Sequence, residues 1–159
     1  MKKEELIGLK LKARSLKIAI AESCSGGLIA DRITDVDGAS GYLEAGFVTY
    51  SNESKSRFLG VPEEIIKEKG AVSSEVATLM AEGVRKVTGV DIGVSSTGIA
   101  GPTGGTEEKP VGTVYIALSS PDGTFVRRLS LKGGRLEIKR QTSDEVLRMI
   151  DDYLEGRVS

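Results

Sequence analysis

Three side chains that could act as nucleophiles stand together in the stretch AESCSGG, residues 21–27. A short β-rich run, KIAIAES, precedes it, and a segment typical of a helix, LIADRITD, follows its two glycines. Open α/β sheets bind ligands where a strand ends and a helix begins, because the free N–H groups there favour an anion or a developing oxyanion. The same residues would also suit a plain capped turn with a buried cysteine. The candidate site residues in this stretch are Glu22, Ser23, Cys24, Ser25 and Gly26.

The chain contains no histidine, and this restricts the chemistry available to any of these nucleophiles. Neither a Ser-His-Asp triad nor a Cys-His pair can be built. Histidine metal sites are excluded, and a single cysteine cannot form a thiolate cage around zinc, so a site built from carboxylates alone is the metal site left open. A serine nucleophile would therefore need a lysine, a tyrosine or a carboxylate as its base. We expect no metal and no cofactor.

Two candidate bases occur in the segment FVTYSNESKS, residues 47–56. Tyr50 lies near the end of the second expected strand, and Lys55 lies in the first turns of the helix that follows. Both should reach the edge of the sheet that carries Ser23, although a lone lysine is usually an exposed helical residue. Burial would lower the pKa of a lysine and make it a base near neutral pH. Glu22 would either orient this lysine or be a solvated acid.

A loop rich in glycine, TGIAGPTGG, follows the third expected strand and should open at the same edge. Dense glycine allows the backbone to approach a ligand closely and to present N–H groups to an anion. The loop has neither the phosphate-loop spacing nor the dinucleotide spacing. Arg140, on the last expected helix, is a further candidate anion contact. The binding candidates in the loop are Gly98, Ile99, Ala100, Gly101, Gly104 and Gly105.

The elements that must position these residues alternate between strands and helices, which indicates an α/β layered domain. We find no repeat, linker or low-complexity segment, so we expect one domain over residues 1–159. The predicted helices cover 3–15, 28–35, 52–60, 62–70, 74–89 and about 136–154. The predicted strands cover 17–23, 42–51, 91–98, 113–120 and 124–132, with turns at 36–40 and 121–123.

Composition excludes several classes of protein. The net charge of −1 lacks the basic excess typical of nucleic-acid binding. One cysteine rules out an internal disulfide, no apolar run approaches the length of a membrane span, and the N-terminus is a poor signal peptide. We expect a cytoplasmic protein without nucleic-acid or membrane partners, and a homodimer or higher homo-oligomer.

Several longer motifs together resemble one family along almost the whole chain. They are AESCSGG, GFVTYSNESK, GAVSSEVA, STGIAGPTGGTEEKPVGTVYIA and KRQT. These segments, in this order, are similar to the nicotinamide-nucleotide amidases, a family that includes the C-terminal domain of the competence- and damage-inducible CinA proteins. The resemblance implies a three-layer α/β/α sandwich with a mixed sheet, here as a stand-alone domain. Thr103 departs from the Asp or Glu that many members carry at this position.

The resemblance also implies a reaction, the hydrolysis of nicotinamide mononucleotide to nicotinate mononucleotide and ammonia. It assigns Ser23 as nucleophile, with Tyr50 and Lys55 as its catalytic partners. It places Ser40, the Gly98–Gly105 loop and Arg140 on the side that binds the substrate. Two other hypotheses stay open: a nucleotide-binding or regulatory module with the same pocket, and a hydrolase that uses Cys24, whose pKa the neighbouring helix start could lower.

Overall fold

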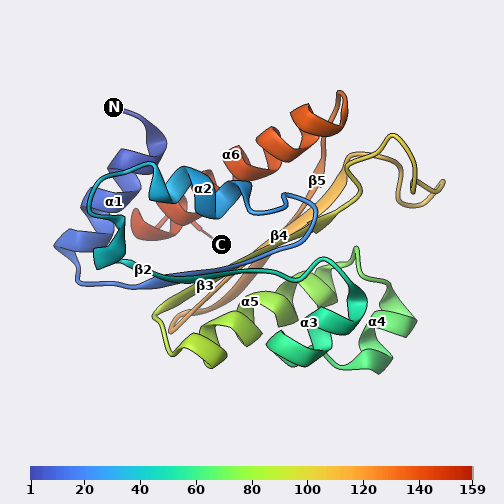
Figure 1. Ribbon diagram of the computed structural model, residues 1–159, viewed down its shortest axis with the longest axis horizontal. Coiled ribbons are helices and arrows are strands. Elements are labelled where there is room, and N and C mark those ends of the chain that lie inside the picture. The colour runs from blue at the N-terminus through green and yellow to red at the C-terminus, as the bar shows by residue number, and fades with distance from the viewer. Residues whose placement is uncertain (159) are drawn as a thin grey trace.

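Strands and helices alternate along the chain in the computed structural model, which describes residues 1–158 (Figure 1). The helices are α1 Lys3–Ala13, α2 Leu28–Thr34, α3 Asn52–Leu59, α4 Glu63–Lys69, α5 Ser74–Thr88 and α6 Arg135–Leu154, with a 3₁₀ turn, η1, at Ala39–Gly41. The strands are β1 Ile18–Glu22, β2 Leu43–Val48, β3 Ile92–Gly98, β4 Thr113–Ser120 and β5 Gly123–Ser130.

The five strands form one mixed sheet in the order β2-β1-β3-β4-β5. β2 and β3 run parallel to β1, so that Glu22 is in register with both Val48 and Ser96. β4 runs antiparallel to β3, and β5 antiparallel to β4. Because parallel strands end at the same edge of a sheet, Ser23, Thr49 and the start of the glycine-rich loop meet there.

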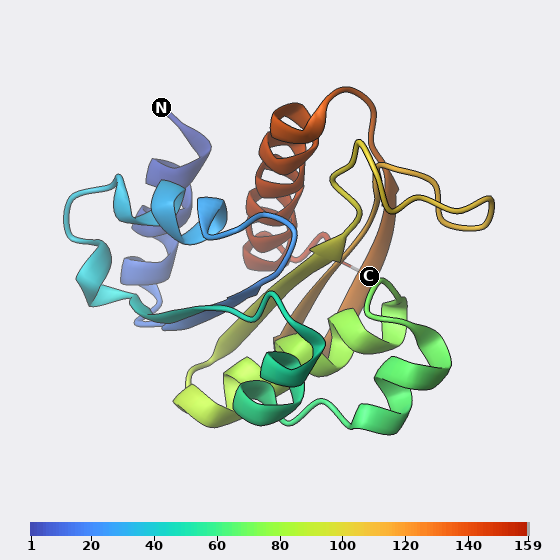
Figure 2. The ribbon, with the colours of Figure 1, turned by 45° about the vertical axis from the view of Figure 1, so that its right-hand side comes forward.

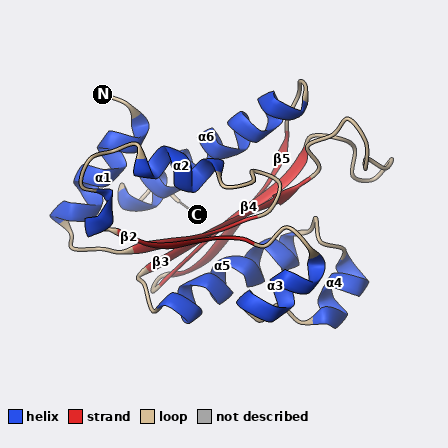
Figure 3. Ribbon diagram, in the orientation of Figure 1, coloured by secondary structure: helices blue, strands red, loops and turns tan. Residues whose placement is uncertain are grey.

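Helices cover both faces of the sheet, with α1, α2 and α6 on one side and α3, α4 and α5 on the other (Figures 1 and 3). Alternate residues of β1 enter the two cores: Ile18 and Ile20 pack in the cluster of α1, α2 and α6, and Ala19 and Ala21 in that of α5. The small side chains on the second face let α5 lie close to the sheet. The expected three-layer α/β/α sandwich with a mixed sheet is confirmed.

The structure corrects the predicted bounds of β2 and shows which side chains of α1 are buried. β2 ends at Val48 and not near Ser51, because the backbone after it turns to bring its carbonyl groups around a lysine described below. In α1 the buried stripe is Ile7, Gly8 and Leu11, whereas Leu9 is mostly exposed. A side chain at Gly8 would clash with the ring of Tyr42, so a glycine lets α1 approach its neighbours.

The sheet and its two helical layers take in elements from Lys3 to Leu154. Of the domain predicted over residues 1–159, Ser159 lies outside the described residues. Within residues 1–158, the helices lack the combination of length and apolar character that crossing a membrane requires.

Candidate active site

Lys55 and Ser23 meet directly at the carboxyl edge of the sheet. Ser23 follows the last residue of β1, and Lys55 lies in the first turn of α3, whose start is capped by Ser51. The Nζ atom of Lys55 lies 3.2 Å from the Oγ atom of Ser23. Lys55 is only 1% exposed and Ser23 8% exposed, so water is largely excluded from this contact. The pair is therefore shielded but still reaches the surface through the serine.

The surroundings of Lys55 suit a neutral amine. Burial lowers the pKa of Lys55 below the usual lysine value of 10.5, and no carboxylate contacts its Nζ atom within residues 1–158. Nζ donates hydrogen bonds to the carbonyl oxygens of Thr49 at 2.8 Å and Tyr50 at 3.2 Å, and the carbonyl of Ser51 lies at 3.5 Å. A neutral amine has two N–H groups and one lone pair. With both N–H groups on the two nearer carbonyls, the lone pair can accept the hydroxyl proton of Ser23.

Glu22 braces the turn after β1 and does not contact Lys55. Its carboxylate is 1% exposed and accepts a hydrogen bond from the Ser25 hydroxyl at 2.6 Å. It also accepts from the N–H groups of Gly27, Ile29 and Ala30 at 2.9 to 3.1 Å. The buried carboxylate thus accepts from four donors, and in doing so it satisfies N–H groups at the start of α2 that have no partner within the helix. Both expected roles of Glu22, orienting the lysine and lying in solvent, are thus replaced by a structural one.

The other two candidate nucleophiles are occupied or inactivated. The Ser25 hydroxyl is fully buried between Glu22 and the hydroxyl of Ser96, 2.7 Å away on β3. Cys24 is 5% exposed and packs in the apolar core; burial, with the nearby Glu22 charge, raises the pKa of its thiol to about 12. The expected lowering of this pKa by the helix start is therefore wrong. Of the three side chains, Ser23 is the one with a base beside it.

Backbone N–H groups next to Ser23 could hold an oxyanion. Gly26 N–H donates to the carbonyl of Ser23, and Gly27 N–H donates to Glu22, so these two are occupied. The N–H groups of Cys24 and Ser25 have no acceptor within residues 1–158. The geometry thus narrows the oxyanion candidates from the range Cys24–Gly26 to the first two of these residues.

Tyr50 contributes through its backbone carbonyl, while its side chain points elsewhere. The tyrosine is 59% exposed, and its hydroxyl accepts a hydrogen bond at 2.9 Å from Arg135, the first residue of α6. Arg135 also donates at 2.8 Å to the carbonyl of Gly101 in the glycine-rich loop. Arg135, which the sequence reasoning missed, thereby ties three segments together above the Lys55–Ser23 pair. The structure offers a direct contact of Lys55 with Ser23 and no relay through the Tyr50 hydroxyl.

A hollow of about 460 Å³ adjoins the turn after β1. Its walls are residues Ser25 to Leu28 and Asp31 on one side, and Leu136, Lys139 and Arg140 on the other. Arg140, predicted as an anion contact, is therefore beside the turn, and Lys139 is a second cation that the sequence reasoning missed. Within residues 1–158, neither these two side chains nor Arg135 forms an ion pair with a carboxylate. The hollow adjoins Ser23 without including it or Lys55, and its two cations outweigh Asp31, so the mouth of the site carries a net positive charge.

The predicted loop residues lie at the site edge, and Ser40 does not. Gly98 ends β3, Ala100 is buried, and Ile99 pairs through its backbone with Thr113 and Gly112. Gly104 and Gly105 are exposed, and part of the loop between β3 and β4 projects from the body (Figure 2). Ser40 is exposed in η1, before β2, and so lies at the opposite edge of the sheet. Within one chain it is not part of this site.

The family model of the CinA C-terminal domain matches residues 1–154, so the chain belongs to this family. A CinA-like protein of Syntrophus aciditrophicus is 52% identical over 152 residues, and one of Desulfotalea psychrophila is 48% identical over 150 residues. These matches cover 95% and 94% of this chain, which spans about 36% of the length of each relative.

Solved structures show the same fold over the whole chain. The competence/damage inducible protein CihA of Agrobacterium tumefaciens superposes with a TM-score of 0.89 at 36% identity, covering 98% of this chain and 97% of that one. A CinA superfamily protein of Klebsiella pneumoniae 700603 superposes with a TM-score of 0.92 at 28% identity, covering 98% and 99%. The family resemblance inferred from the sequence is confirmed.

Proposed function

We propose that this chain is an amidohydrolase that converts nicotinamide mononucleotide to nicotinate mononucleotide and ammonia. The observation that carries the proposal is the 3.2 Å contact between the Lys55 amine and the Ser23 hydroxyl in a shielded position. Ser–Lys pairs replace the histidine of a triad in other hydrolases, and this chain has no histidine. The family resemblance supplies the substrate.

The first half of the reaction forms an acyl-enzyme. The Lys55 amine takes the hydroxyl proton of Ser23, and Oγ attacks the carboxamide carbon of the substrate. The negative charge that develops on the amide oxygen is held by the N–H groups of Cys24 and Ser25. Collapse of the tetrahedral intermediate breaks the C–N bond, and the lysine ammonium returns its proton to the departing nitrogen. Ammonia leaves, and an ester links Ser23 to the substrate.

The second half restores the serine. A water molecule gives its proton to Lys55 and attacks the ester carbon. Oγ then leaves and takes the proton back from the lysine, and the carboxylate product is released. Proton transfer of this kind by a positioned base contributes about 10²–10⁴-fold to a rate.

The positive mouth of the site suits the phosphate of the substrate. Arg135 binds only neutral oxygens, the Tyr50 hydroxyl and the Gly101 carbonyl, and has no carboxylate partner within residues 1–158. Its guanidinium can therefore bind a phosphate at the cost of two neutral hydrogen bonds. Lys139 and Arg140 add charge along the same helix. Leu136 lines the same hollow as Lys139 and Arg140. Its apolar side chain is 74% exposed and can contact the nucleoside part of the substrate.

The test is ammonia release from nicotinamide mononucleotide by the purified chain, in the presence of EDTA. We expect Ser23→Ala and Lys55→Met to lower kcat by about 10²–10⁴-fold. Lys67→Met, which changes an exposed residue of α4, should keep full turnover. If the wild type binds the nucleotide and releases no ammonia, a nucleotide-binding module becomes the better assignment. Near-normal turnover by Ser23→Ala would refute catalysis through this serine.

A further inference from the structure

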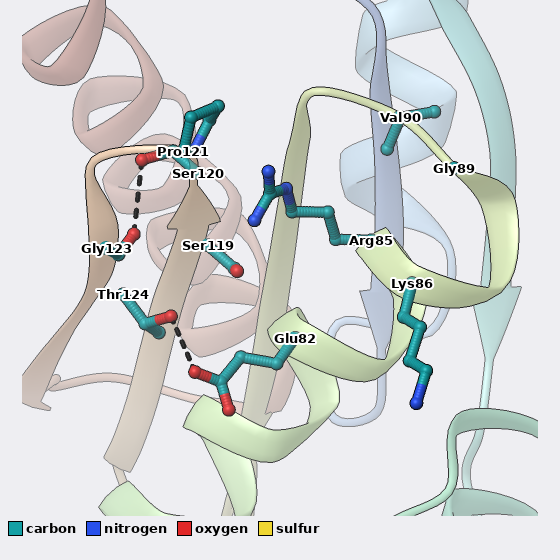
Figure 4. A pocket seen from close by; sticks show the side chains of 10 residues that line it. All are labelled: Glu82, Arg85, Lys86, Gly89, Val90, Ser119, Ser120, Pro121, Gly123 and Thr124. Atoms are coloured by element: carbon teal, nitrogen blue, oxygen red, sulfur yellow. Dashed lines mark hydrogen bonds between the residues drawn. The ribbon is translucent and has the colours of Figure 1, made fainter.

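A second and larger hollow, of about 740 Å³, lies at the edge of the sheet opposite to Ser23 (Figure 4). The end of α5 forms one wall, and the turn between β4 and β5 forms the other. Its volume falls within the range of about 300–1,000 Å³ that small-molecule sites occupy. The Lys55–Ser23 mechanism uses none of its residues.

Arg85 presents a fixed pair of free donors to this hollow. Its Nε atom donates at 3.0 Å to the carbonyl of Asp91, which fixes the direction of the side chain. Its two terminal amino groups make no hydrogen bond and no ion pair within residues 1–158. An arginine held in this way offers the planar fork that binds a carboxylate or phosphate through two parallel hydrogen bonds.

Ser119 supplies a second hydrogen-bond donor to the hollow, from a different element than Arg85. It lies on the face of β4 that packs against α5, and it is only 3% exposed. Its hydroxyl has no hydrogen-bond partner within residues 1–158, yet the residue lines the hollow beside Arg85 (Figure 4). Its oxygen faces the hollow and is not sealed from solvent, so the hydroxyl is free to donate a hydrogen bond to an anion bound beside Arg85.

Two other charged side chains border the hollow: an acid that would repel an anion and a base that would attract one. Glu82 lies one turn before Arg85 without pairing to it, and its Oε2 accepts a hydrogen bond from Thr124 at 2.7 Å (Figure 4). Lys86 adds a positive charge on the same helix. The three side chains together carry a net charge of +1, with the negative charge turned toward the Thr124 wall.

We propose that Arg85 and Ser119 form a binding site for a small oxyanion, a carboxylate or phosphate group of a metabolite. The Arg85 fork donates two hydrogen bonds to the anion, and the Ser119 hydroxyl donates a third. The remaining volume holds the rest of the molecule. Ligand bound here is separated from Ser23 by the length of the sheet, so this site does not depend on the proposed amidase activity.

The test uses NMR of the ¹⁵N-labelled chain, titrated with inorganic phosphate and, separately, with acetate at constant ionic strength. We expect saturable shifts of the backbone amides of Ser119, Thr124 and Gly89. Arg85→Gln should weaken this binding about tenfold or more, and Ser119→Ala severalfold. Glu82→Gln should tighten it about twofold by removing the opposing charge. Arg14→Gln, which removes an exposed arginine elsewhere, is the matched control and should leave the titration unchanged.

A response to both anions supports a general oxyanion site, and a response to one of them identifies the group that the site prefers. The proposal is overturned if these amides do not shift, or if Arg85→Gln or Ser119→Ala titrates like the wild type. Shifts confined to Ser25–Leu28 would also overturn it, because they would place the anion at the amidase site. Should Arg85→Gln fail to fold, Ser119→Ala and Glu82→Gln still decide the question.

Discussion

Lys55 is the residue on which the proposed reaction depends most, because one side chain must be buried, neutral and in contact with Ser23. Burial lowers the pKa of its amine, and the protonated form cannot act as a base. We predict that kcat/KM for nicotinamide mononucleotide rises with pH and levels off above an apparent pKa lower than 10.5. Ammonia release measured between pH 6 and pH 10 checks this. Activity that falls with rising pH over the whole range would exclude a lysine base.

Cys24 should be chemically unreactive, because burial raises the pKa of its thiol. With a pKa of about 12, only about one thiol in 10⁴ is ionised at pH 8. We expect iodoacetamide to react with Cys24 at least about a hundredfold more slowly than with free cysteine. Cys24→Ala should keep kcat within about twofold of the wild type. Rapid alkylation with parallel loss of ammonia release would restore Cys24 as a candidate nucleophile.

At the element scale, the start of α2 depends on an acid supplied by the preceding strand. Gly27 at the N-cap has no side chain to cap the helix, and the Glu22 carboxylate takes that role. In Glu22→Gln one acceptor oxygen becomes a donor facing other donors. We predict that this change lowers the free energy of unfolding by about 1–3 kcal/mol, measured by urea denaturation.

The same change should disturb the turn that carries the oxyanion donors. We expect kcat of Glu22→Gln to fall with little change in KM, because the donors act on the transition state and not on the bound substrate. Glu53→Gln, an exposed acid on α3, is the matched control and should change neither quantity. A stability loss without any fall in kcat would show that the cap is structural only.

The first turns of α6 are the element that would recognise the substrate phosphate. Arg135→Gln should raise KM for nicotinamide mononucleotide about tenfold or more, because a charged hydrogen bond is lost. It should have little effect on nicotinamide riboside, which lacks the phosphate. Arg148→Gln, an exposed arginine nearer the other end of α6, should leave both substrates unaffected. An equal loss on both substrates would mean that Arg135 only holds Tyr50 and Gly101 in place.

The elements themselves could be predicted from the sequence, since periodicity and turn residues mark each of them. What could not be predicted are contacts made by backbone atoms or by residues distant in sequence. The carbonyls of Thr49 and Tyr50 around Lys55 carry no sequence signal. Arg135 was missed because its partners lie 34 and 85 residues away, although its place after Gly133 and Gly134, at a helix start, was a usable hint.

At the scale of the whole molecule, the layered fold is what makes a buried lysine possible. β1 brings Ser23 to the edge from the centre of the sheet, and the parallel pairing of β2 with β1 brings α3 to the same edge. Lys55 then reaches inward from the helix to the serine. The fold therefore carries a cost, since an amine that is charged at neutral pH in the unfolded chain loses its hydration on folding.

That cost predicts how stability depends on pH. Because the pKa of Lys55 is lower in the folded chain than in the unfolded chain, the unfolded chain binds more protons between the two values. The free energy of unfolding should therefore rise with pH, from the folded pKa up to about 10.5, by about 1.4 kcal/mol for each unit of pKa lowering. Lys55→Met lacks this titration. The Cys24 thiol, on whose pKa the Lys55 charge acts, has a pKa of about 12 in the folded wild type and so stays protonated there up to pH 10. We predict that wild type minus Lys55→Met, measured by urea denaturation from pH 7 to pH 10, has a positive slope. A zero slope of this difference would mean that Lys55 is as easily protonated in the folded chain as in the unfolded chain.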